Sequence, residues 1–123
     1  MNYDYINAET WNDRWVVEEV FLGMRKGFCV EAGVCDGVGY SPTYVLEKEF
    51  EWTGILVEPN PVFFERGLEN DRPNFTCVNK GLAGENKTVD FYCIDNTGGG
   101  YNGFPSLNSF GEFFSITLAA PRV

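Results

Sequence analysis

The chain of 123 residues carries 18 acidic and 9 basic side chains and no histidine, which gives a formal net charge of −9, and 44% of its residues are hydrophobic. This length suffices for one domain with a single modest core, and the hydrophobic content is too high for a disordered chain. Because a surface this acidic repels phosphate backbones and anionic lipids, the charge argues against a nucleic-acid or membrane-surface role.

The N-terminal sequence MNYDYINAET lacks the basic and apolar regions of a signal peptide, and no apolar run reaches the roughly 18 residues that a membrane-spanning helix needs. We therefore expect a cytoplasmic protein. The four cysteines show no CxxC spacing, so without histidine we expect no metal site. Cys29, Cys77 and Cys93 fall in apparent strands, where a reduced cysteine behaves as a small core residue. The lack of histidine also leaves the catalytic base unidentified.

A first helix is predicted to begin at Asn7 or Thr10, either of which can serve as its cap, and to end near Phe21. Trp11 and Trp15 lie about one helical turn apart, and this aromatic stripe predicts a helix face packed against the sheet. The polar positions between and after them are expected to face solvent: Asn12, Asp13, Arg14 and Glu19.

The middle of the chain has the order of a nucleotide-binding β-α-β unit. A strand is predicted from Phe28 to Val34, and a loop that contains Gly33, Gly37 and Gly39 accompanies its end. Ser41, followed by proline, predicts the start of a helix that ends near Phe50. In that helix we expect Val45 or Leu46 and Phe50 to face inward, and Glu47, Lys48 and Glu49 to face outward.

Further strands are predicted at Ile55–Val57, Phe75–Asn79, Thr88–Ile94 and Phe113–Leu118. Asn60 is expected to cap a helix that begins at Pro61. Residues 81–87 are predicted to form a loop, and residues 95–112 a flexible glycine-rich segment. Strands that alternate with helices predict an α/β domain over residues 1–123, with a mainly parallel sheet and flanking helices. The last strands are expected to form an antiparallel pair.

The glycine loop predicts the kind of nucleotide. The spacing of Gly33, Gly37 and Gly39 does not match the GxGxxG fingerprint of dinucleotide-binding proteins, which disfavours NAD. Glu31 and Asp36 would repel a pyrophosphate, but they suit a ligand with a cationic end. S-adenosylmethionine is such a ligand, because it has an ammonium group and a sulfonium but no phosphate. Glu58, which ends the next strand, is placed to accept hydrogen bonds from ribose hydroxyls.

The sequence EAGVCDGVGYSPTYVLEKEFEWTGILVEPNPVFFERGLENDRPN resembles the FkbM-type S-adenosylmethionine-dependent methyltransferases. Their pattern pairs a (D/E)xGAxDG loop with a downstream W-x-G-I-x-x-EPNP strand and a later Arg-Pro. The resemblance covers roughly residues 15–94, and Val34 and Cys35 depart from the loop pattern in a minor way. The matching positions are Glu31, Gly33, Asp36, Gly37, Ser41, Leu46-Glu47-Lys48, Trp52, Gly54, Glu58-Pro59-Asn60-Pro61 and Arg72-Pro73.

The resemblance implies a Rossmann-like class I methyltransferase fold that transfers a methyl group, usually to a hydroxyl of a sugar or natural product. It places Glu31, Gly33 and Gly37 at the methionine end of the cofactor. Asp36 belongs to the same loop and is a further candidate. It also implies that Glu58 binds the ribose and that Pro59 and Asn60 flank the adenine, with Asn79 as a further candidate at the adenine edge.

Family members continue with another acid-ended strand and with closing strands that this sequence lacks, so the resemblance implies a truncated domain without the acceptor-binding half. Two hypotheses follow. The chain is the cofactor-binding half of an FkbM-like methyltransferase whose acceptor is unknown. Alternatively, it is a catalytically inactive small α/β binding or assembly protein that forms a homo-oligomer to cover an open sheet edge.

Overall fold

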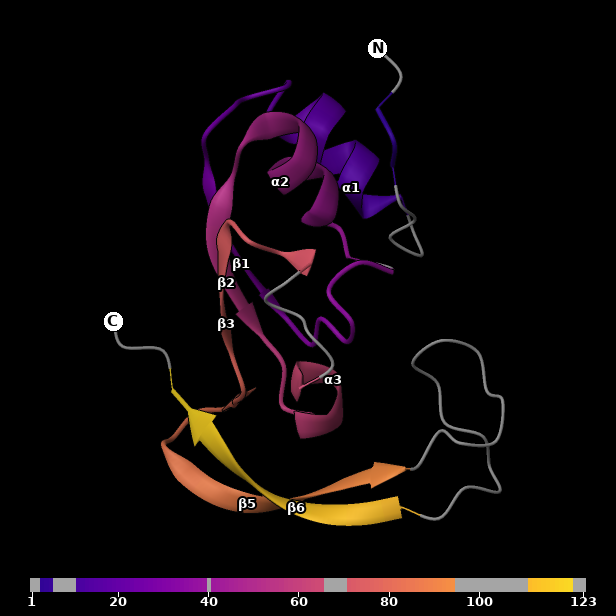
Figure 1. Cartoon of the computed structure of the whole chain (residues 1–123). Coiled ribbons are helices and arrows are strands. Elements are labelled where there is room, and N and C mark those ends of the chain that lie inside the picture. The colour runs from indigo at the N-terminus through magenta and orange to yellow at the C-terminus, as the bar shows by residue number, and fades with distance from the viewer. Residues whose placement is uncertain (1–2, 6–10, 40, 66–70, 95–110, 121–123) are drawn as a thin grey trace.

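The computed structural model describes residues 3–5, 11–39, 41–65, 71–94 and 111–120, and these form two three-stranded sheets with short helices (Figure 1). The first sheet consists of β1 (Phe28–Ala32), β2 (Thr53–Val57) and β3 (Phe75–Val78), in that order and all parallel. The second has the order β4 (Gly81–Leu82), β6 (Gly111–Ala119), β5 (Lys87–Ile94). This is an α/β architecture, as the sequence predicts.

The connections of the parallel sheet carry the helices α2 (Tyr44–Phe50) and α3 (Pro61–Glu65). In Figure 1 these two helices and α1 (Asn12–Trp15) lie on the same side of the sheet. Asn60 caps α3 as predicted, because its Oδ1 accepts the N–H of Val62 at 2.9 Å. Gly54 allows β1 and β2 to approach, since a Cβ there would lie 1.9 Å from the carbonyl oxygen of Cys29.

The core lies between the helices and this face of the sheet. One cluster of buried side chains joins α2 to the segment before β1, and its members are Val17, Val45, Leu46, Phe50 and Trp52. A second cluster lies under the glycine loop and contains Val34, Leu56, Phe75 and Cys77. The half-buried Cys29 packs against both clusters, so they form a continuous layer. The inward positions predicted for Val45, Leu46 and Phe50 are confirmed.

The second sheet contains the predicted antiparallel pair, in which the whole of β5 pairs with residues 111–118 of β6. β4 was not expected, because residues 81–87 were predicted to be a loop; it pairs in parallel with the end of β6. A strand of two residues is too short to produce an alternating pattern in the sequence. Of the predicted glycine-rich segment 95–112, residues 95–110 lie outside the described residues, and the last two positions belong to β6.

The prediction for the first helix is wrong in its start and in its buried face. α1 begins at Asn12, after Trp11 with a left-handed φ of 58°, and continues as the π-helix η1 (Val16–Val20). Trp11 and Trp15 are 58% and 60% exposed, whereas Asp13 is fully buried. Trp15 N–H donates to the carbonyl oxygen of Trp11 at 3.0 Å, so the two tryptophans do share a helix face. That face is the exposed one, and Asp13 and Val17 lie on the buried one. Asn7 and Thr10 lie outside the described residues.

The second helix also differs from the prediction. It begins at Tyr44 with Thr43 at the N-cap position, and Ser41 lies before the helix and makes no cap hydrogen bond there. Glu47 was expected to face solvent but is only 2% exposed, because its carboxylate pairs with the buried Arg72. Lys48 and Glu49 are exposed, as predicted.

The opposite face of the parallel sheet carries exposed apolar side chains. Phe28 and Val30 on the edge strand β1 are 64% and 55% exposed, and the register places Val30 beside the half-buried Ile55. No described helix lies on this side in Figure 1. Parallel sheets are normally covered on both faces, so this surface is unusual for its type. None of the helices in the described ranges is long and apolar enough to cross a membrane.

Candidate ligand site at the carboxyl edge of the parallel sheet

The three parallel strands end at one edge of the sheet, and a predicted site residue follows each of them. Gly33 follows β1, Glu58 follows β2 and Asn79 follows β3. In open α/β sheets ligands bind outside the carboxyl ends of the strands, where the connecting loops leave a crevice. The fold therefore brings three segments of the predicted site to the edge at which such folds bind ligands.

Glu58 is the centre of this edge. Its Oε2 accepts the N–H of Cys35 at 2.8 Å, and its Oε1 accepts the N–H of Asn60 at 2.8 Å. Glu58 is only 4% exposed, and this burial raises the pKa of its carboxyl, while the backbone N–H groups of Asn60, Cys35 and Val34 act in the opposite direction. The carboxylate thus ties the loop after β1 to the start of α3.

Asn79 completes the connection between the strand ends. Its Nδ2 donates to the carbonyl oxygens of Glu58 at 2.7 Å and of Pro59 at 3.1 Å. Glu58, Pro59, Asn60 and Asn79 are therefore brought together, as one compact group. An ionised carboxylate offers about four lone-pair positions, so Glu58 keeps about two beyond those that the backbone uses.

The glycine loop approaches this group through backbone conformations that favour glycine. Gly33 and Gly37 have φ values of 72° and 76°, and Cys35 between them also has a positive φ, of 52°. A Cβ built at Gly33 would meet no heavy atom within 4 Å, so there is open space above this position. A ligand that approaches the carboxyl end of β1 would meet bare backbone there.

Asp36 does not point toward the group around Glu58. Its Oδ1 accepts the N–H groups of Val38 and Gly39, each at 2.9 Å, so the carboxylate closes a turn within its own loop. The side chain is exposed, and its second oxygen makes no hydrogen bond to any of the described residues. One oxygen of the Asp36 carboxylate therefore stabilises the loop, and the other remains available to a ligand.

Glu31 lies on the covered face of β1, apart from Glu58. Its Oε2 accepts the hydroxyls of Ser41, at 2.8 Å, and of Thr43. Both donors precede α2, so Glu31 connects the first strand to the start of that helix. Its Oε1 has no hydrogen-bond partner within the described part of the chain. The structure thus places the two predicted acids in different environments.

The group of side chains that supports this loop is centred on Arg72 and was not predicted. Its guanidinium is wholly buried; Nε pairs with Glu47, and Nη1 donates to the carbonyl oxygen of Gly37 at 2.7 Å. Nη1 also donates to Ser41 Oγ at 3.0 Å, and Nη2 donates to Thr43 Oγ1 at 2.9 Å. Arg72 therefore holds both the glycine loop and the hydroxyls that contact Glu31.

One signal of this group was present in the sequence. Glu47 lies three residues before Phe50, so a charged side chain shares the face of α2 on which Phe50 lies. Such a placement indicates a buried partner, because an unpaired charge is costly to bury. The partner, however, is 25 residues further along the chain.

Cys29, in β1, and Cys35, in the glycine loop, both have thiols with a raised pKa. Burial raises the pKa of Cys29 to about 11, and burial and then the Glu58 carboxylate raise the pKa of Cys35. Neither thiol therefore has the lowered pKa of a nucleophile. Within the described ranges, no group of three or more His, Cys, Asp or Glu side chains is arranged to hold a metal ion.

No protein-family model, curated protein or solved structure matches this chain.

Proposed function

We propose that this chain binds S-adenosylmethionine as the cofactor-binding part of an FkbM-like methyltransferase, with a Rossmann-like class I fold. In the full-length form the reaction is O-methyl transfer to a hydroxyl of a sugar or small natural product. The observation that carries the proposal is the hydrogen bond of 2.8 Å from Cys35 N–H to Glu58, which brings an acid against the glycine loop at the carboxyl edge of a parallel sheet.

The residues at this edge fit the chemical groups of the cofactor. Glu58 retains lone pairs for the ribose hydroxyls, and Pro59 and Asn60 flank the position of the adenine. The open backbone at Gly33 and the loop at Gly37 accept the methionine end, where Glu31 Oε1 is available to the ammonium group. No phosphate has to be held near these acids, which is why this cofactor fits better than a dinucleotide.

Calorimetric titration of the chain with S-adenosylmethionine and with S-adenosylhomocysteine tests the proposal. Saturable heat with both ligands, and none with NAD, is the expected result. The proposal is contradicted if neither S-adenosylmethionine nor S-adenosylhomocysteine gives heat while the circular dichroism spectrum indicates a folded α/β protein.

The exposed apolar face favours a second candidate, a catalytically inactive binding or assembly protein. Phe28 and Val30 are more than half exposed on the edge strand of a parallel sheet. A homodimer would remove such side chains from water. Light scattering coupled to gel filtration measures the mass in solution, and a monomer at all concentrations contradicts this candidate.

A further inference from the structure

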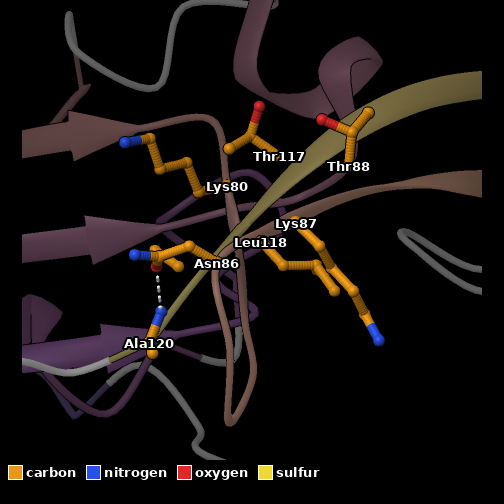
Figure 2. Close-up of a pocket in the computed structure, with 8 residues that line it drawn as sticks. Lys80, Asn86, Lys87, Thr88, Thr117, Leu118 and Ala120 are labelled. Carbon is orange, nitrogen blue, oxygen red and sulfur yellow. Dashed lines mark hydrogen bonds between the residues drawn. The ribbon is translucent and has the colours of Figure 1, made fainter.

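A cavity of about 370 Å³ lies at the end of β6, and none of its lining residues is a predicted residue of the cofactor site (Figure 2). Its walls come from two stretches that are distant in the sequence, residues 80–88 and 117–120. The lining residues are Lys80, Asn86, Lys87, Thr88, Thr117, Leu118, Ala119 and Ala120.

The backbone fixes the shape of this cavity. Leu118 of β6 lies opposite Gly81 on one side and opposite Lys87 on the other, so the chain from β4 to β5 passes around the end of β6. Two hydrogen bonds hold the strand end in place, from Ala83 N–H to the carbonyl oxygen of Ala119 at 3.1 Å and from Ala120 N–H to Asn86 Oδ1 at 2.8 Å. Figure 2 shows the second of them.

The lining offers hydrogen-bond donors and no carboxylate. Two of the chain's nine basic residues, Lys80 and Lys87, line this cavity, although acids outnumber bases two to one in the whole sequence. Thr88 and Thr117 are cross-strand partners, so their side chains leave the same face of the β5–β6 pair. Neither hydroxyl, nor the ammonium of Lys80, has a hydrogen-bond or ion-pair partner among the residues the structure describes.

Lys87 is engaged, but only at the surface. Its Nζ lies 2.6 Å from Glu85 Oε1, and the two side chains are 49% and 68% exposed. In Figure 2 the side chain extends away from Lys80. Lys87 precedes Thr88 in β5, so its side chain leaves the opposite face of the β5–β6 pair from the two threonines and does not belong to their donor set.

We propose that this cavity binds a small oxyanion group, a phosphate or a carboxylate. Lys80 supplies the unpaired charge, and the Thr88 and Thr117 hydroxyls, which leave the same face of the β5–β6 pair, supply neutral donors. The volume corresponds to about a dozen water molecules at roughly 30 Å³ each, which limits the ligand to a small ion or the anionic end of a small metabolite. The charge of the rest of the chain opposes binding only weakly at physiological salt, where screening acts over about 8 Å.

Nuclear magnetic resonance titration of the ¹⁵N-labelled chain tests the proposal. Sodium phosphate, methyl phosphate and sodium acetate are added separately, with chloride as the reference at matched ionic strength. Saturable shifts of the Lys87, Thr88, Thr117 and Leu118 amides are expected with at least one oxyanion and not with chloride. The three arms distinguish free phosphate, a phosphomonoester and a carboxylate. Linear shifts with every salt, chloride included, overturn the proposal.

The variant Lys80→Gln provides the second measurement. It removes the unpaired ammonium at an exposed position, and the affinity is expected to fall at least fivefold. Lys26→Gln is the matched control, because Lys26 is an exposed lysine that pairs with Glu51 outside the cavity. Equal affinity in the Lys80→Gln variant and the wild type would also overturn the proposal. Since the cavity shares no lining residue with the candidate cofactor site, Lys80→Gln leaves S-adenosylmethionine binding unchanged.

Discussion

Arg72 and Glu47 form an ion pair in which both side chains are 0% exposed. The charges are satisfied by neighbours on several segments, since Arg72 also donates to Gly37 and Glu47 also accepts the N–H of Asn74 at 2.8 Å. The Arg72 guanidinium also lies 4.5 Å from the centre of the Phe75 ring. A buried pair of this kind is costly to break, because the partner that remains is a charge without water.

We therefore expect Arg72→Leu to lower the free energy of unfolding by about 3–5 kcal/mol, measured by urea denaturation at neutral pH. Arg25→Leu is the control, since Arg25 pairs with Glu51 at 3.2 Å but is 54% exposed, and it should cost less than about 1 kcal/mol. Adding Glu47→Gln to Arg72→Leu should recover part of the loss, because it removes the unpaired charge. Equal losses for Arg72→Leu and Arg25→Leu would contradict this account of the pair.

Glu58→Ala is expected to weaken S-adenosylmethionine binding by about 1–3 kcal/mol, the usual range for the loss of a hydrogen bond to a charged group. Calorimetric titration measures the change. Glu49→Ala is the matched control, because Glu49 is an exposed carboxylate on α2, and its affinity should equal that of the wild type. Unchanged affinity in Glu58→Ala would remove Glu58 from the site.

Burial of Glu58 also predicts a pH dependence of stability. The pKa of its carboxyl is raised in the folded state above the ordinary value of 4.5. A raised pKa means that the folded protein favours the protonated form, so the stability from this group is fully present below pH 4.5 and is lost as the pH rises through the folded pKa. The wild type should therefore lose stability relative to Glu58→Gln over that interval. Denaturation curves that give a constant difference from pH 4 to 7 would contradict the raised pKa.

Gly54→Ala is expected to destabilise the fold by about 3 kcal/mol, at the upper end of the usual range for overpacking. The new Cβ would lie 1.9 Å from the carbonyl oxygen of Cys29 and 2.7 Å from the Phe75 ring, and the backbone of β1 cannot move aside without breaking the sheet. Gly84→Ala serves as the control, since a Cβ there meets nothing within 4 Å. Thermal unfolding followed by circular dichroism should separate the two variants, and similar midpoints would refute the close approach of the strands.

The sequence correctly predicts those structural elements that depend on only a few neighbouring residues. The cap at Asn60 and the antiparallel pair of the last two strands follow from short-range chemistry, and both are confirmed. The prediction that Trp11 and Trp15 are buried is wrong for a different reason. Their spacing correctly places them on one helix face, as the bond from Trp15 N–H to the Trp11 carbonyl oxygen shows, but spacing alone does not tell which face is buried. After Trp15 the helix also departs from the predicted α-helix, since Phe21 N–H donates to the carbonyl oxygen of Val16, five residues earlier.

The sequence predicts which residues of the candidate site lie at the ends of the strands, but it does not predict the contacts that their side chains make. The order of strands and glycines placed Gly33, Glu58 and Asn79 at one edge. The different surroundings of Glu31 and Glu58 depend on Ser41, Thr43 and Arg72, which meet only after the chain has folded. Contacts over such separations leave no periodic trace in a single sequence.

The hydrogen bond from Arg72 to the carbonyl oxygen of Gly37 spans 35 residues. During synthesis, a nascent chain that ends before Arg72 already contains the whole glycine loop and both flanking strands, but it lacks the guanidinium that holds the loop. Bringing together residues so far apart in the sequence lowers the chain entropy before the hydrogen bond can form and stabilise the loop. We therefore expect the loop to reach its final shape late in folding, after β3 has paired with β2.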